Sequence, residues 1–372
     1  RWGALVIVAF TMMAAYYVND VVAPLKTMLE TDLAWSSTDF GFFTGGYSFL
    51  NVFFLMLIWG GLILDRFGIR FTGKLATILM VGGTALEYYA MTGRAGPDAT
   101  LFGINEIFGY KTGVFVAFAG YSIFGVGAEV AGITVSKIIA KWFKGKELAT
   151  AMGVQVALAR IGSQAGYAVA IPLARAFGIS TPVLLGLVLL LGGMIAFFIF
   201  AVMDKKLDKQ MEAAAIAAGT EDEEEKFSFK DVKNILVNPG FWLIALLCVL
   251  FYSCVFPFQK FASELMIIKY GINENVAGTF AGLPALGALI LTPVFGGFID
   301  KRGKSASIML LGSAMLICVH FIYAIPDINY WLVAIVLMII LGIAFSLVPS
   351  AMWPAVAKIF PVSQLGTAYA LI

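Results

Sequence analysis

The stretch GGLILDRFGIR at residues 60–70 has a near copy, FGGFIDKRGK, at residues 295–304. Each stretch closes a long apolar run with a glycine pair, one aspartate and a basic turn. Two copies so far apart indicate that the chain is built from two related halves. Internal repeats of this kind are typical of membrane transporters.

The composition identifies a membrane protein. Of the 372 residues, 60% are hydrophobic and only 13% are charged, and the mean hydropathy is +0.92. A soluble domain is roughly half apolar, with about a quarter of its residues charged. The values found here exclude an ordinary soluble domain and predict an all-α protein with several membrane-spanning helices.

Long apolar runs predict ten membrane spans, because a spanning helix needs roughly 20 mostly apolar residues. The predicted spans are residues 2–23, 38–64, 71–92, 113–140, 148–174, 180–203, 239–268, 274–299, 305–325 and 331–356. Residues 363–372 begin a further apolar run. We therefore expect the chain to end inside helix eleven of a twelve-helix fold.

The acidic run at residues 221–225 divides the predicted spans into two groups. We expect an N-terminal six-helix bundle at residues 1–203, a cytoplasmic linker at residues 204–238 and an incomplete C-terminal bundle at residues 239–372. The linker is too polar to span a membrane. A cytosolic helix or a flexible tether would serve equally well there.

Lysine and arginine gather in the loops on one side of the predicted spans, as at Arg66, Arg70, Lys137 and Lys141, and are sparser on the other side, as at Lys26. Cytoplasmic loops carry the excess of positive charge, so the richer side is predicted to be cytoplasmic.

The chain contains no Asn-x-Ser/Thr glycosylation sequon. This favours a bacterial inner membrane, with a lysosomal membrane as the alternative.

The repeated motif predicts a gate at the cytoplasmic ends of its helices. The glycine pairs would let both helices pack closely against a neighbour. Asp65 and Asp300 would accept hydrogen bonds from an adjoining helix N-terminus, and the basic residues would lie at the level of the lipid headgroups. Such a motif would hold the two halves together in one conformation and release them in another. The alternative is a plain positive-inside turn, but two copies at matching places favour the gate.

These residues resemble the major facilitator superfamily, whose loop between helices two and three carries a G-x-x-x-D-R-x-G-x-R pattern. The matching residues are Gly61, Asp65, Arg66, Gly68 and Arg70 in the first copy, with Asp300, Lys301 and Arg302 in a weaker second copy. The resemblance implies the major facilitator fold, in which two pseudo-symmetric six-helix bundles work by alternating access.

Four segments of the second half also resemble the lysosomal dipeptide transporter branch of that superfamily, known from animals. They are FYSCVFPF (251–258), DKRGK (300–304), MWPAVA (352–357) and QLGTAY (364–369). This resemblance implies dipeptide substrates moved by facilitated diffusion. Animal members also need a glycosylated accessory subunit, and the sequence shows no site for one.

Glu129 and Arg160 are the most informative charges, because each lies near the middle of a predicted span. A charge there costs a few kcal/mol unless it faces water or a partner. A dipeptide presents an ammonium at one end and a carboxylate at the other. Arg160 offers a planar fork for the carboxylate, and Glu129 offers the countercharge for the amine. The spacing of Glu129 and Arg160 also resembles the terminus-binding pair of the dipeptide branch. The alternative is that the two residues pair with each other and hold two helices together.

Further residues are predicted to line the cavity, because they lie on helices that line it in the superfamily. They are Tyr16, Gln155, Tyr252, Phe256 and Trp353, together with the charged residues Asp20 and Lys260. Aromatic and amide walls tolerate varied substrate side chains, whereas the alternative for each aromatic residue is a lipid-facing or core position. Glu87 and Glu264, toward the outer ends of their helices, are expected to be solvated or paired. Pro257 would interrupt helix seven.

No catalytic motif is evident, since the sequence lacks a Walker loop, a Cys/His metal cluster and a Gly-x-Ser-x-Gly elbow. We therefore expect a monomeric transporter of a small-molecule substrate in the lipid bilayer, and not an enzyme, with no cofactor, no metal and no nucleic acid. The predicted function is uniport of dipeptides by alternating access, because the ExxER signature of proton-coupled peptide transporters is missing. The alternatives are a proton-coupled organic anion or sugar-acid transporter of the same superfamily, and a membrane receptor or scaffold that does not transport.

Overall fold

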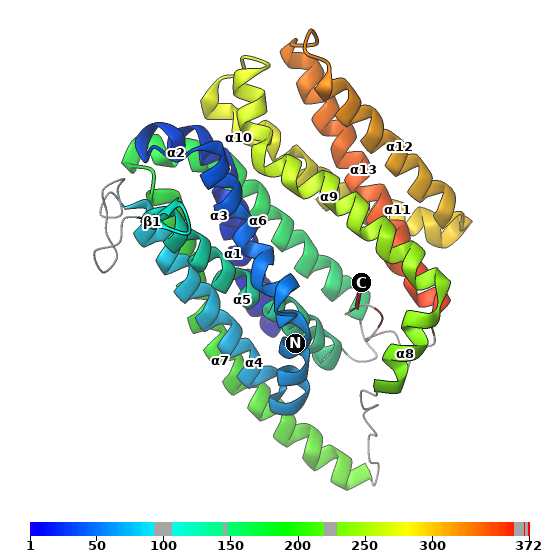
Figure 1. Cartoon of the computed structure of the whole chain (residues 1–372). Helices are drawn as coiled ribbons and strands as arrows, with labels where there is room; N and C mark the ends of the chain where they lie inside the picture. Colours follow the sequence, from blue (N-terminus) through cyan, green and yellow to red (C-terminus); the bar gives the residue numbers. More distant parts are fainter. Residues whose placement is uncertain (93–105, 144–146, 219–228, 361–367, 369–370) are drawn as a thin grey trace. The chain divides into compact units, whose positions relative to one another are not determined.

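A computed structural model describes residues 1–92, 106–143, 147–218, 229–360, 368 and 371–372 (Figure 1). The helices are α1 (Trp2–Val21), the 3-10 helix η1 (Ala23–Leu25), α2 (Lys26–Asp32), α3 (Ser37–Phe53), α4 (Met56–Met91), α5 (Thr112–Trp142), α6 (Leu148–Phe177), α7 (Thr181–Ala218), α8 (Phe229–Val237), α9 (Pro239–Ile268), α10 (Glu274–Ala281), α11 (Leu283–Arg302), α12 (Ser305–Ala324) and α13 (Trp331–Ile359). A short hairpin of β1 (Glu106–Ile107) and β2 (Tyr110–Lys111) precedes α5. The all-α fold class predicted from the composition is confirmed, and the predicted start of helix eleven lies largely outside the described residues.

Seven of the described helices are long and apolar enough to cross a membrane, or eight if the bent pair α3 and α4 counts as one span. Ten spans were expected from the sequence. One difference is that α4 contains both the end of the second predicted span and the whole of the third. The other is α6, which is 30 residues long but carries polar residues such as Gln155 and Arg160 among its small ones.

The described chain forms two compact units. Unit 1 comprises residues 1–206, 260–268 and 272–282, and unit 2 comprises residues 207–259, 269–271 and 283–372. One boundary therefore runs through α9. Helix α7 continues through residues 204–218, which form the first part of the predicted linker, so that part is a helix rather than a flexible tether. The division into two bundles and a linker stays a prediction.

The chain reverses direction at Gly68, in the middle of α4. Gly68 has φ 74°, a value that interrupts the helical conformation. A Cβ at Gly60 would lie 2.5 Å from Val130 Cγ2, and a Cβ at Gly127 would lie 2.7 Å from the Ala76 carbonyl oxygen. Residues 60 and 76 thus contact neighbouring turns of α5, although in a straight helix they would lie about 24 Å apart. The two legs of this helical hairpin therefore flank α5, as the two separate predicted spans require.

The second copy of the motif makes the same turn within unit 2. Gly303, three residues after Asp300 as Gly68 is three after Asp65, has φ 68°. It separates α11 from α12, and Ile299 and Ile308 on either side of it join one apolar cluster with Leu347 and Ala351 of α13. The sequence repeat is therefore also a repeat of backbone conformation, because glycine adopts positive φ without the steric cost that a Cβ imposes.

The predicted role of the glycine pairs is only partly correct. Gly60 lies against α5, but a Cβ at Gly61, Gly296 or Gly297 would meet no atom within 4 Å. The close helix contacts lie elsewhere, for example where a Cβ at Gly83 would lie 2.4 Å from the Phe124 backbone nitrogen. The first pair therefore allows a close helix contact through Gly60, whereas the second pair makes none among the described residues.

Two predicted spans are broken helices. The second span breaks at Leu55, which has φ 52°, and α3 and α4 meet there at 58°. The span predicted at 274–299 breaks after Ala281 into α10 and α11. Pro284 explains the second break, because a proline lacks the N–H that would continue the helix and disfavours the helical conformation of the residue before it.

We predict that Gly68→Ala destabilises the protein and that Gly61→Ala does not. Neither new methyl group would meet another atom within 4 Å, so only the backbone differs. Positive φ costs a residue with a Cβ about 1–2 kcal/mol, whereas alanine in place of a helical glycine is neutral or stabilising. Thermal unfolding of the detergent-solubilised protein should show a lower Tm for Gly68→Ala alone. Equal shifts for both variants would contradict the hairpin at Gly68.

Candidate functional site

Glu129 is held by a hydrogen bond from a neighbouring helix. Tyr47 on α3 donates its hydroxyl to Glu129 Oε1 on α5 at 2.7 Å. The two helices touch one turn earlier on α5, because a Cβ at Gly125 would lie 2.3 Å from the Tyr47 carbonyl oxygen. The absence of a side chain at Gly125 therefore lets Tyr47 approach Glu129. Tyr47 is a site residue that the sequence analysis missed.

Arg160 lies against the ring of Tyr16. Its guanidinium carbon is 5.6 Å from the centroid of the Tyr16 ring, within the range of a cation–π contact. Gly162 permits this contact, because a Cβ there would lie 2.1 Å from the Met13 carbonyl oxygen of α1. The charges of Arg160 and Glu129 both act on the Tyr16 hydroxyl. The structure thus brings the predicted acid, the predicted base and Tyr16 into one region of unit 1.

Gln155 lies on the same helix as Arg160 but points elsewhere. The two residues are five positions apart on α6, which separates their side chains by about 140° around a helix of 3.6 residues per turn. Both side chains are half-buried. The role of Gln155 in the cavity wall stays a prediction.

The predicted aromatic residues of the second half form a cluster within unit 2. Tyr252 and Phe256, one turn apart on α9, stack with their ring centroids 5.1 Å apart. Phe345 of α13 contacts both, at 6.4 Å and 6.1 Å between centroids. Trp353 is half-buried and packs against the apolar cluster around Met352, as Tyr252 also does. Phe345 was missed because nothing in the sequence distinguishes it from the other phenylalanines of the spans.

Charged residues of the first motif copy have partners within unit 1. Lys137 Nζ donates to Asp65 Oδ1 at 2.9 Å, and both side chains are exposed. Asp65 is thus paired with a lysine of α5, and its predicted contact with a helix N-terminus stays a prediction. Arg66 lies over the Phe67 ring at 5.5 Å. Gly61 makes no close contact, as described above.

Asp204 is the buried acid of this region and was missed by the sequence analysis. Its side chain is 0% exposed. It accepts hydrogen bonds from Lys141 Nζ at 2.8 Å and Trp142 Nε1 at 2.9 Å, and Arg70 Nε lies 3.8 Å from its other oxygen. Asp204 follows directly on an apolar run and precedes Lys205, so its sequence context is that of a polar linker. The structure places it inside α7 instead.

The second motif copy is described in part. Lys301 and Arg302 are exposed, and the Arg302 guanidinium lies 5.2 Å from the Phe298 ring centroid, much as Arg66 lies over Phe67. The side chain of Asp300 lies outside the described part of the structure. The predicted latch between the two motif copies stays a prediction.

Glu87 departs from its expected environment. Its side chain is 0% exposed, and neither carboxyl oxygen has a hydrogen-bond partner among the described residues. The positive charge of Lys260 acts on the Glu87 carboxylate. Glu87 on α4 is therefore buried against α5, neither solvated nor hydrogen-bonded as the sequence suggested.

Comparison with known proteins identifies the same group of proteins as the sequence motifs. The family model described as Major Facilitator Superfamily matches residues 5–372. The Lysosomal dipeptide transporter MFSD1 of Homo sapiens is 28% identical over 383 residues, which cover 99% of this chain and 75% of that protein.

Solved structures share the fold. A D-xylose-proton symporter superposes with a TM-score of 0.65 at 16% identity, covering 100% of this chain and 85% of the symporter. A peptide transporter POT in complex with sulfate superposes with a TM-score of 0.66 at 14% identity, covering 99% of this chain and 85% of that chain. At these identities the likeness concerns the fold alone.

We predict that Asp204→Ala destabilises the protein far more than Asp65→Ala. Removing the buried Asp204 takes away one acceptor of Lys141 and the acceptor of the Trp142 N–H, and breaking a buried ion pair costs about 3–5 kcal/mol. Asp65 and Lys137 form an exposed pair, which contributes at most about 1 kcal/mol. Thermal unfolding in detergent measures both effects, and a similar small shift for both variants would show that Asp204 does not fasten α7 to α5.

Proposed function

The chain belongs to the Major Facilitator Superfamily and is a multi-pass membrane transporter, and we propose that it moves dipeptides by alternating access as a uniporter. The arrangement of Glu129 and Arg160 carries this proposal. One acid and one base, contributed by α5 and α6, lie near the same tyrosine of α1. They can bind the two ends of a zwitterion without contacting its side chains.

The chemistry of the two residues suits the two ends of a dipeptide. The planar guanidinium of Arg160 can bind a carboxylate through two parallel hydrogen bonds. Glu129, oriented by the Tyr47 hydroxyl, keeps a second carboxylate oxygen for an ammonium group. Tyr16 would support the peptide backbone between them. Selection by the termini alone would let one site accept many dipeptides.

The named relatives support the same substrate class. The human protein, which matches this chain over nearly its whole length, is called a lysosomal dipeptide transporter. The organic-anion or sugar-acid alternative is an outcome of the experiment below. The compartment stays a prediction, and the relatives' names support the lysosomal membrane over the bacterial inner membrane.

We predict that each charged residue recognises one end of the substrate. Three ligands test this: a dipeptide, its N-acetyl derivative without the ammonium, and its C-terminal amide without the carboxylate. Glu129→Gln should weaken binding of the dipeptide and the amide but leave the N-acetyl derivative unaffected. Arg160→Gln should weaken binding of the dipeptide and the N-acetyl derivative but leave the amide unaffected. Loss of a charged hydrogen bond of about 1.5–3 kcal/mol corresponds to a weakening of about 10- to 150-fold.

Ligand-induced thermal stabilisation measures the affinities, and counterflow in liposomes measures transport. Arg1→Gln is the matched control, because Arg1 pairs with Glu147 at an exposed site. If either variant lowers the Tm of the ligand-free protein and weakens all three ligands equally, the two residues hold helices together instead. Stabilisation by monocarboxylates without an amine would favour the organic-anion alternative. No ligand response at all would favour a receptor or scaffold.

A further inference from the structure

The final turns of α9 belong to unit 1, although the rest of the helix belongs to unit 2. Residues 239–259 lie in unit 2 and residues 260–268 in unit 1. Pro257 lies inside the helix just before this boundary. A proline removes one hydrogen bond from the helix interior and permits a kink. The end of α9 can therefore make or break its contacts with α1 and α2 by bending at Pro257.

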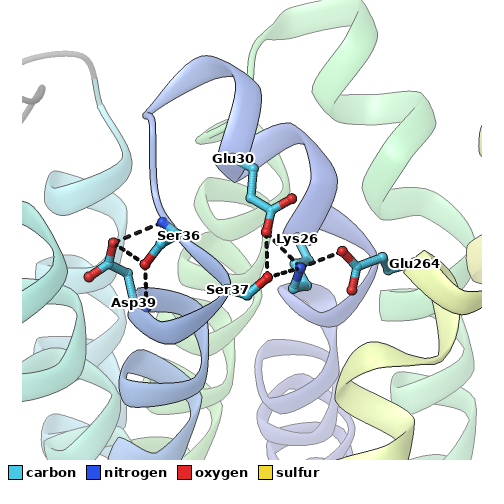
Figure 2. A network of polar contacts seen from close by, with 6 residues as sticks. All are labelled: Lys26, Glu30, Ser36, Ser37, Asp39 and Glu264. Atoms are coloured by element: carbon cyan, nitrogen blue, oxygen red, sulfur yellow. Dashed lines mark hydrogen bonds and ion pairs between the residues drawn. The ribbon is translucent and has the colours of Figure 1, made fainter. Parts of the chain in front are cut away.

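Lys26, at the start of α2, fastens this end of α9 from one side. Its Nζ donates to Glu30 Oε1 at 2.6 Å, to Ser37 Oγ at 2.8 Å and to the carboxylate of Glu264 on α9. Figure 2 shows the ammonium between the two glutamates, with Ser37 beside it. The Lys26 side chain is 1% exposed, so all three of its protons are used by protein acceptors. The Phe261 ring lies 5.7 Å from Lys26 Nζ.

Lys260, one turn before Glu264, fastens the same end of α9 to α1. Its Nζ donates to the Asn19 carbonyl oxygen at 2.5 Å and to Tyr121 Oη at 3.1 Å, and lies 3.5 Å from Asp20 Oδ1. Asp20 also accepts a hydrogen bond from Ser163 of α6. Asp20 lies one turn from Tyr16 on α1, so this contact borders the candidate substrate site.

The two ion pairs are reciprocal. An acid of α1 meets a base of α9 in Asp20–Lys260, and a base of α2 meets an acid of α9 in Lys26–Glu264. Each lysine also has a glutamate four residues later on its own helix, Glu30 for Lys26 and Glu264 for Lys260. Residues at this spacing face each other on a helix and can pair. Lys26 already contacts its local partner Glu30 and would keep it when α9 moves away, whereas Lys260 would gain Glu264, which Lys26 then releases.

This local alternative lowers the cost of separating the helices. Removing one partner from a buried ion pair costs about 3–5 kcal/mol, because it leaves a charge uncompensated. Lys26 keeps Glu30, which it already contacts in this structure, and Lys260 would gain Glu264, so neither lysine is left without a carboxylate. Asp20 keeps Ser163 and Asn19 as donors. While the helices are in contact, Lys26 holds both glutamates and Lys260 holds Asp20.

We propose that Asp20, Lys26, Glu30, Lys260 and Glu264 form a partner-exchange latch at the side of the membrane opposite the Arg66 motif. The latch is cross-paired and closed in this structure. It opens when Glu264 passes from Lys26 to Lys260 and Lys260 releases Asp20, while Lys26 keeps Glu30, as the transporter exposes its site on that side. The inference rests on the alternating access of the proposed function but not on the identity of the substrate.

Double electron–electron resonance between spin labels at Thr31→Cys and Ile268→Cys tests the latch. Both positions are exposed, one on α2 and one at the end of α9. The labels are introduced into a variant whose three native cysteines are replaced by alanine. The short distance between the labels reports the closed latch and the long distance the open latch. Glu264→Gln removes the cross partner of Lys26 and should increase the population with the long distance. Glu30→Gln removes the one carboxylate that Lys26 keeps when the latch opens, whereas the closed latch still has Glu264, so this variant should increase the population with the short distance. Each variant should change the ratio of the two populations about tenfold, as expected for the loss of one charged hydrogen bond.

Charge reversal provides the second test. Lys26→Glu should favour the long distance, and Lys26→Glu combined with Glu264→Lys should restore the short distance. Arg1→Gln, at the other end of α1, is the matched control and should change neither population. Shifts of Glu264→Gln and Glu30→Gln in the same direction, or none, would overturn the latch. If Lys26→Glu does not fold, those two conservative variants decide the question.

The measurement needs no substrate, so it separates the latch from the substrate assignment. Opposite shifts in a protein that binds no dipeptide would keep the latch and reject the proposed function. Dipeptide binding without opposite shifts would keep the proposed function and reject the latch.

Discussion

A charge within a bilayer needs a partner, and the positions of the charged side chains in this transporter follow from that constraint. Asp204 is fully buried between Lys141, Trp142 and Arg70, and Lys26 is buried among three acceptors. Each cluster joins at least two helices, because no single helix can supply all the partners of one group. The charged clusters are therefore the points at which helices of unit 1 are fastened. Glu87, without a hydrogen-bond partner among the described residues, is the exception.

Glycine provides the complementary constraint. Gly68 and Gly303 adopt positive φ at matching places of the repeated motif. At each of them the chain turns back, so that the helical segments before and after the glycine both pack against one third helix. Gly125 and Gly162 act differently, because the missing side chain brings Tyr47 and Tyr16 close to the charged residues of the candidate site. The charges of the site are thus positioned by residues that have no side chain of their own.

The sequence was sufficient for the fold class, because the apolar runs and the repeat of residues 60–70 at residues 295–304 depend on local composition. The family resemblance drawn from the motif is confirmed by the family model, which matches residues 5–372. Helix breaks at Leu55 and after Ala281 were missed, since a short break leaves the apolar run intact. Asp204, Tyr47 and the partners of Lys26 were missed for a different reason. Their roles depend on contacts between distant segments, which one sequence does not encode as a pattern.

The exchange of partners at Lys26 and Lys260 has an electrical consequence. Moving one elementary charge through the membrane changes the free energy by about 2.3 kcal/mol per 100 mV. The latch keeps its lysines and acids on their own helices, and a dipeptide with uncharged side chains has no net charge. The complete cycle would then carry no current, so the membrane voltage would neither drive nor oppose it. Only the difference in dipeptide concentration across the bilayer would set the direction of net flow.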